Sequence, residues 1–175
     1  KDGDNEFNAY GASLAYSMDL SKQIEIGLRY GYDMRNFNNE SVENLYAHNL
    51  QSAVQYAFTK KSKLKFGIGT RFEDSDQAAR AKDQVQFMLG YNHKWNSGFY
   101  IKPVAAYVFS ERDAASNSTS PVREDDRTQF TLAGGYEFDM GMVIEAQYGT
   151  LNNDTNLENK DTSNDRFVLL TGWSF

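Results

Sequence analysis

The sequence predicts an all-β protein whose long antiparallel strands follow one another in an up-and-down order. Aromatic residues and glycine are abundant, with 11 Tyr, 12 Phe and 13 Gly against only 2 Pro, and this composition favours extended structure. Apolar and polar residues alternate along most of the chain, which is the period of a strand and not of a helix. The polar connections alternate between short and long, as expected for hairpins that meet at the two ends of one sheet.

The alternation is clearest between Gln23 and Arg35. One face of this segment carries Ile24, Ile26, Leu28, Tyr30, Tyr32 and Met34. The other face carries Glu25, Gly27, Arg29, Gly31, Asp33 and Arg35. Such a run of matches with period two predicts a strand. The same pattern predicts strands at 8–20, 22–36, 44–59, 62–74, 83–95, 98–112, 126–139, 141–152 and 164–175.

The connections between these strands predict one domain over residues 1–175. Short connections fall near 19–22, 60–61, 96–98 and 140–141. Long polar connections rich in Asp, Glu, Asn and Ser fall at 36–44, 74–83, 112–126 and 152–164. No linker or change of composition divides the chain, so we expect a meander of hairpins with tight turns at one end and long loops at the other.

Composition excludes several classes of protein. The net charge is −6 and no basic tract stands out, so we expect no nucleic-acid partner. Cysteine is absent, which removes disulfide and zinc-thiolate chemistry. The longest apolar run, Pro103 to Phe109, is far shorter than the ~20 residues that a spanning helix needs.

Three features favour a transmembrane barrel over a soluble sheet. The predicted strands are mostly about 11–15 residues long, whereas globular strands have about 5–6 residues and a tilted membrane strand needs about 9–11. The polar face is rich in small residues, which suit a narrow lumen. Aromatic residues gather near the strand ends, as in the two girdles that a barrel places at the membrane interfaces. The predicted interface aromatics are Tyr16, Tyr32, Tyr46, Phe58, Phe72, Trp95, Phe99, Tyr107, Phe109, Phe130, Phe138, Tyr148, Phe167, Trp173 and Phe175.

With these features the sequence resembles the Gram-negative outer-membrane β-barrel superfamily. The resemblance covers the whole chain, from the short turns and long acidic loops to the alternating aromatic end at Trp173 and Phe175. It implies a transmembrane antiparallel up-and-down β-barrel in the bacterial outer membrane, in contact with the lipid bilayer and lipopolysaccharide. It also implies that the C-terminal strand is the signal read by the outer-membrane assembly machinery.

The predicted strand number is odd, whereas bacterial single-chain barrels have an even number. We therefore expect at least one strand before Lys1, or a missed or split segment, and ten or twelve strands in the full protein.

Catalysis is not expected. The two histidines, His48 and His93, both fall on the apolar register of their strands. No serine, histidine and acid constellation or metal-ligand pattern is visible. We predict no enzyme activity, no cofactor and no metal site.

The polar register of the strands defines the predicted lumen. Its basic members are Arg29, Arg35, Lys65, Arg71, Lys94, Lys102, Arg112, Arg127 and Arg166. Its acidic members include Glu25, Glu137 and Glu145, with Asp33 and Glu73. Two interpretations stay open here. The charges could pair and fill a narrow barrel, or the basic residues could attract anionic or polyhydroxylated solutes in a water-filled channel, with Lys102 as a candidate constriction.

We therefore expect a small monomeric porin, a channel for passive diffusion of small hydrophilic solutes with a bias toward anions. At the level of architecture, this arrangement resembles the porins for acidic oligosaccharides. The alternative is a non-conducting barrel whose long acidic loops serve adhesion, envelope stability or ligand binding. A soluble β-barrel binder is the third interpretation.

Overall fold

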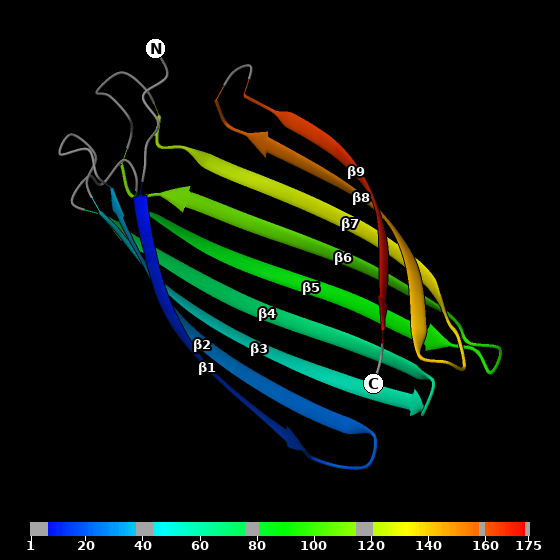
Figure 1. The fold of residues 1–175 in the computed structure, drawn as a ribbon. Helices are drawn as coiled ribbons and strands as arrows, with labels where there is room; N and C mark the ends of the chain where they lie inside the picture. The colour runs from blue at the N-terminus through cyan, green and yellow to red at the C-terminus, as the bar shows by residue number, and fades with distance from the viewer. Residues whose placement is uncertain (1–6, 38–43, 76–80, 115–120, 158–159, 174–175) are drawn as a thin grey trace.

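Nine strands hydrogen-bonded in chain order form one antiparallel sheet in the computed structural model, which describes residues 7–37, 44–75, 81–114, 121–157 and 160–173 (Figure 1). The strands are β1 (Phe7–Asp19), β2 (Ile24–Phe37), β3 (Leu45–Thr59), β4 (Ser62–Ser75), β5 (Lys82–Lys94), β6 (Phe99–Arg112), β7 (Glu124–Glu137), β8 (Met142–Thr155) and β9 (Thr162–Trp173). The predicted all-β meander is confirmed.

The largest differences from the predicted bounds lie next to the long polar connections. β7 begins at Glu124, and β8 continues to Thr155. Backbone pairing there extends past the last apolar residues, for example between Asp125 and Thr155. Hydrophobic periodicity does not detect such a polar extension, because backbone hydrogen bonds do not require apolar side chains.

Tight turns close the hairpins at one end of the sheet, here called the turn end, and the long connections lie at the opposite loop end. Two turns place glycine in the left-handed region, Gly98 with φ of 92° and Gly141 with φ of 85°. The amide of Gly98 donates to the carbonyl of Trp95 at 3.2 Å, and that of Gly141 donates to the carbonyl of Phe138 at 2.9 Å. Other residues rarely adopt this conformation, so these glycines fix the two turns.

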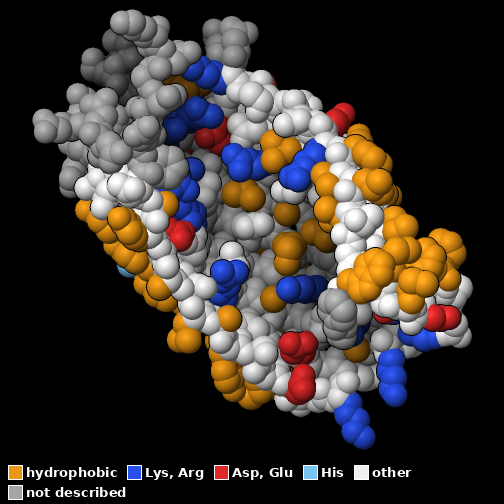
Figure 2. Space-filling view, in the orientation of Figure 1, with side chains coloured by type: hydrophobic (Ala, Val, Ile, Leu, Met, Phe, Trp, Pro, Cys, Tyr) orange, Lys and Arg blue, Asp and Glu red, His pale blue; other side chains and the backbone are white. Residues whose placement is uncertain are grey.

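The register keeps the two kinds of side chain on opposite faces through the whole sheet. On β2 and β3, Glu25 lies opposite Gln55 and Asp33 opposite Ala47, while Ile26 lies opposite Val54. We call the first face the inner face and the second the outer face. The sheet is curled, with β9 crossing in front of its middle strands (Figure 1). Figure 2 shows that Lys, Arg, Asp and Glu side chains gather within the hollowed side of the curled sheet.

The outer face has no protein layer over it among the described residues. Large apolar side chains on this face stay open, as in Leu14 at 75% and Phe167 at 70% exposure. In the part of the chain that the structure describes, the buried apolar residues are Ala47, Ala81, Tyr100 and Ala133. No helix in the described ranges is long and apolar enough to cross a membrane. An exposed apolar surface of this extent is typical of a protein–protein or membrane interface.

The sheet stays open in the described part of the chain. β1 pairs only with β2, and β9 pairs only with β8. Because the strands alternate in direction, the first and the ninth run the same way. The expectation of further strands before Lys1 remains a prediction.

Candidate pore-lining face

All twelve residues predicted to line a lumen lie on the inner face. Cross-strand partners share a face, so the inner face can be followed through the eight strand pairs. It begins with Ala15 of β1 opposite Arg29 of β2 and ends with Gly149 of β8 opposite Arg166 of β9. The residues are Glu25, Arg29 and Arg35 on β2, Lys65 and Arg71 on β4, Lys94 on β5, Lys102 and Arg112 on β6, Arg127 and Glu137 on β7, Glu145 on β8 and Arg166 on β9.

A charge network joins β2, β3, β4 and β5 near the loop end. The Arg71 guanidinium donates to Asp33 at 3.0 Å, to Glu73 at 2.6 Å and to the side-chain oxygen of Asn49 at 2.8 Å. Lys82 adds a second cation, 3.5 Å from Glu73. Asn49 also donates to Asp33 at 2.9 Å. Every charge in this network therefore has an opposite partner, and its main effect is to hold four strands together.

A second network lies near the turn end of β6, β7 and β8. Lys102 and the Tyr100 hydroxyl both donate to Glu145, at 2.9 and 2.7 Å. These residues stand on strands separated by β7, where the residue opposite both Tyr100 and Glu145 is Gly135. A glycine at this point lets the tyrosine ring cross β7 and reach the carboxylate.

Lys94 makes a comparable bond to Glu137 at 2.7 Å, from β5 to β7. This pair and the Lys102–Glu145 pair both span an intervening strand. The candidate constriction residue Lys102 is thus already neutralised by an acid, which makes it a less effective anion attractor than the sequence suggested.

Several inner-face cations have no acid partner in the described part of the chain. Lys65, Arg127 and Arg166 make no ion pair or side-chain hydrogen bond with described residues. Arg29 makes only a hydrogen bond to the Ser13 hydroxyl at 3.3 Å. The inner face therefore contains both paired charges, which brace the sheet, and unpaired cations, which are open to a solute.

Two hollows lie side by side on the inner face over β1 to β5. One of about 450 Å³ is lined by Arg29, Lys65 and Glu25 among others, with Gly27, Gly67 and Gly69 in its wall. The next, of about 420 Å³, shares Arg29 and extends to Asp33 and Arg71. Small residues leave this space open, because side chains of ordinary size would occupy it.

The predicted interface aromatics that can be placed lie on the outer register or in the adjoining turns. Examples are Tyr16 on β1, 61% exposed, Phe99 on β6, 57% exposed, and Trp173 on β9, 58% exposed. Tyr32, Tyr46, Phe72, Tyr107, Phe109, Phe130, Tyr148 and Phe167 also share the outer register, and Phe58, Trp95 and Phe138 lie at the turn end. Phe175 lies outside the described residues.

Both histidines also lie on the outer face. His48 bonds to the Tyr30 hydroxyl through Nδ1 at 2.7 Å, and His93 bonds to the Ser62 hydroxyl through Nδ1 at 2.7 Å. Neither contacts a carboxylate among the described residues. In the same ranges, no group of three His, Cys, Asp or Glu side chains could hold a metal ion.

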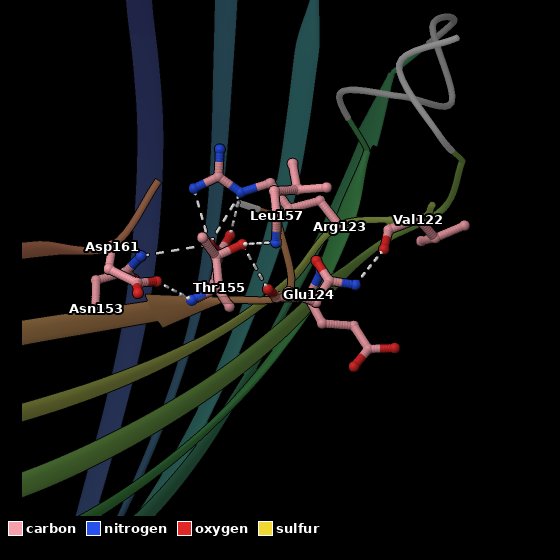
Figure 3. Close-up of polar contacts among 9 residues, drawn as sticks. Val122, Arg123, Glu124, Asn153, Thr155, Leu157 and Asp161 are labelled. Carbon is pink, nitrogen blue, oxygen red and sulfur yellow. Dashed lines mark hydrogen bonds and ion pairs between the residues drawn. The ribbon is translucent and has the colours of Figure 1, made fainter. Parts of the chain in front are cut away.

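A third polar cluster ties together the loop ends of β7 and β8 and the start of β9 (Figure 3). Arg123 donates to both carboxylate oxygens of Asp125, at 2.8 and 2.9 Å. Thr155 donates through its hydroxyl to the carbonyl of Glu124 at 3.0 Å, and its amide donates to Asp161 at 2.9 Å. These bonds order the backbone beyond the last apolar residues of the strands.

Sequence reasoning missed two inner-face residues that the structure shows to be important. Tyr100 and Lys82 both interact with charged partners but were not named as lumen residues. Their alternating position relative to Lys102 and Lys94 was the available signal, because every second residue of a strand shares a face.

No family model and no curated protein matches this sequence. Among solved structures it is similar to OmpT, an outer membrane protein of Vibrio cholerae in its trimer form, with a TM-score of 0.66 and 12% identity over 91% of this chain and 52% of that chain. It is also similar to the siderophore receptor PirA of Acinetobacter baumannii, with a TM-score of 0.57 and 11% identity over 87% of this chain and 28% of that one. The siderophore receptor PirA of Pseudomonas aeruginosa is similar as well, with a TM-score of 0.60 and 9% identity over 97% of this chain and 32% of that chain.

These similarities define the class of protein: the chain has the fold of the Gram-negative outer-membrane β-barrels. At identities of 9–12% the similarity concerns the fold alone. The chain spans about half of the Vibrio protein and about a third of each receptor. The fold class predicted from the sequence is confirmed.

Proposed function

We propose that this sheet is the wall of an outer-membrane diffusion channel for small hydrophilic solutes, with a bias toward anions. The main observation is on the inner face, where the exposed cations Arg29 and Lys65, which have no acid partner among the described residues, line an open hollow. A barrel interior that served only as a packed core would have each of these charges paired or replaced by apolar residues. Unpaired basic side chains along a water-filled passage favour anions over cations.

The outer face supports the membrane part of the proposal. Its exposed apolar belt, with aromatic residues such as Phe99 and Phe167 toward the two ends, suits contact with the acyl chains and head groups of the bilayer and with lipopolysaccharide. Assembly through the C-terminal strand is part of the same proposal.

Single-channel recording in planar bilayers tests the channel. We expect discrete conductance steps from the folded protein and, in a salt gradient, a reversal potential that indicates anion preference. Folded, membrane-inserted protein without steps would overturn the channel, and a cation preference would overturn the role of the lumen cations.

A matched pair of variants shows whether the steps come from this protein. In Gly27→Phe the new side chain enters the larger hollow, since a Cβ at Gly27 would meet only the Tyr16 carbonyl at 3.8 Å. Unit conductance should fall in Gly27→Phe and stay unchanged in Tyr16→Phe, a change on the outer face.

The alternative of a non-conducting barrel acting through its outer loops is supported by the ordered cluster around Arg123 and Asp125. The same recordings separate the two functions, because only the channel requires conductance.

A further inference from the structure

Arg29 and Lys65 line one hollow and lack the acid partners that neutralise other inner-face cations. Both side chains are exposed. The row of residues between the two cations is small, because Gly27, Ala53 and Gly67 lie opposite one another on β2, β3 and β4. The arrangement leaves room for a solute group that could contact both at once.

The register explains why Lys65 is unpaired. Lys65 lies opposite Gln55 of β3, and Gln55 lies opposite Glu25 of β2. Tyr100 and Glu145 occupy the same positions relative to each other across β7, but the residue between them is Gly135, whereas here a glutamine stands on the middle strand. Gln55 donates to Glu25 at 2.9 Å, so the carboxylate is satisfied locally and the lysine stays free.

A similar competition leaves Arg29 without an acid. The nearest carboxylate toward the loop end on its own strand, Asp33, accepts hydrogen bonds from Arg71 and Asn49. The cross-strand partners of Arg29 are Ala15 and Gln51, which carry no charge. Its single bond to the Ser13 hydroxyl leaves most guanidinium donors unused.

The net charge of the hollow is therefore positive. Arg29 and Lys65 contribute two positive charges, and Glu25, held by Gln55, contributes one negative charge at the turn end. Gln51 and Gln86 add neutral amides to the wall. A planar guanidinium with free donors, an ammonium and two amides together match an oxyanion that carries further hydrogen-bonding groups.

We propose that this hollow is a discrete binding site for the oxyanion group, carboxylate or phosphate, of a small solute, with Arg29 and Lys65 as its two charged contacts. The site rests on the proposed function only in that a solute must be able to reach the inner face. It adds that anion attraction is concentrated at one place on the wall and is not a property of all inner-face cations.

The test is calorimetric titration of the folded protein in detergent, separately with inorganic phosphate and with citrate. We expect one anion per chain. Removing one charged contact in Arg29→Gln or Lys65→Gln should weaken binding by roughly tenfold or more, because a hydrogen bond to a charged group is stronger than one between neutral groups. Tighter binding of phosphate or of citrate identifies which oxyanion the site prefers, and either preference supports it.

The matched control is Arg166→Gln. It removes the same charge from the same face, also breaks no ion pair among the described residues, and lies outside the hollow. Its affinity should stay within about twofold of the original, as expected for a screened distant charge. Absence of binding in the unaltered protein, or equal weakening in Arg166→Gln, would overturn the site.

Folding and channel function are controlled separately. Heat-modifiable gel migration shows whether each variant is folded. If Arg29→Gln does not fold, the effect of removing a charged contact is measured on Lys65→Gln alone. Binding in detergent does not require conductance. Anion binding without conductance would therefore support the binding site and contradict the channel. Conductance without anion binding would support the channel and contradict the binding site.

Discussion

Replacing Gly135 of β7 with alanine adds one methyl group where the sheet has no room for it. The new Cβ would lie 2.5 Å from two atoms of Tyr100, its ring carbon Cζ and its hydroxyl oxygen, and 2.5 Å from the carbonyl oxygen of Ile144. Carbon atoms in contact prefer about 3.5–4.0 Å. The tyrosine ring and the β8 backbone would therefore each have to move by about an ångström, and the bond from Tyr100 to Glu145 would be disturbed.

The expected cost follows from these displacements. Overpacking of this kind costs about 1–3 kcal/mol, and the disturbed bond to a carboxylate adds up to about 1.5–3 kcal/mol. Alanine has less backbone entropy than glycine in the unfolded chain, which raises the free energy of unfolding by about 0.5–1 kcal/mol and offsets part of this cost. The free energy of unfolding of Gly135→Ala should thus fall by about 2–4 kcal/mol, taking the terms as only partly additive.

The assay is urea unfolding of the folded protein in bilayers or micelles, followed by tryptophan fluorescence and by gel migration. Gly134→Ala is the matched control, since its Cβ would meet nothing closer than the Tyr100 carbonyl at 3.7 Å. That variant should be as stable as the original or slightly more so. Equal stability of the two variants would refute the steric reasoning. In a Tyr100→Ala background the cost at Gly135 should shrink, because one of the two obstacles is gone.

Three further changes test other parts of the sheet. Arg71→Gln leaves the carboxylates of Asp33 and Glu73 without their shared cation and should lower the free energy of unfolding by about 1–3 kcal/mol. Arg29→Gln breaks no ion pair among the described residues and should change the free energy of unfolding by less than about 0.5 kcal/mol in the same urea titration. Leu132→Lys on the outer face should cost about 2–4 kcal/mol in bilayers and Gln129→Lys on the inner face far less; equal costs would contradict the assignment of the faces. Gly141→Ala forces a side chain into a backbone with φ of 85° and should cost about 1–2 kcal/mol in the same assay, while a neutral result would contradict the strained turn.

Period-two alternation was sufficient to predict the nine strands of the described residues and the faces of the lumen residues on them. The face of Arg29 or Trp173 depends only on the position of that residue along its own strand, which the sequence displays directly. Strand ends were less predictable where polar residues continue the pairing, as at Asp125 and Thr155.

The pairing of the charges could not be predicted. Lys102 and Glu145 are 43 residues apart and stand on strands that are not neighbours. Their contact depends on the registers of two strand pairs, β6 with β7 and β7 with β8, and no local pattern encodes such a combination. For the same reason the sequence could not indicate that Lys65 stays free, because that outcome depends on Gln55 occupying the middle strand.

The ion pairs that span an intervening strand bear on how the sheet finds its register. A slip of one residue between neighbouring strands exchanges the two faces and is opposed by the whole apolar pattern. A slip of two residues keeps every side chain on its own face, so alternation alone cannot detect it. It would, however, move Lys102 away from Glu145 and Lys94 away from Glu137, since each pair is fixed by two successive registers. These bonds can form only after the third strand is in place, and they then reject misaligned hairpins during assembly.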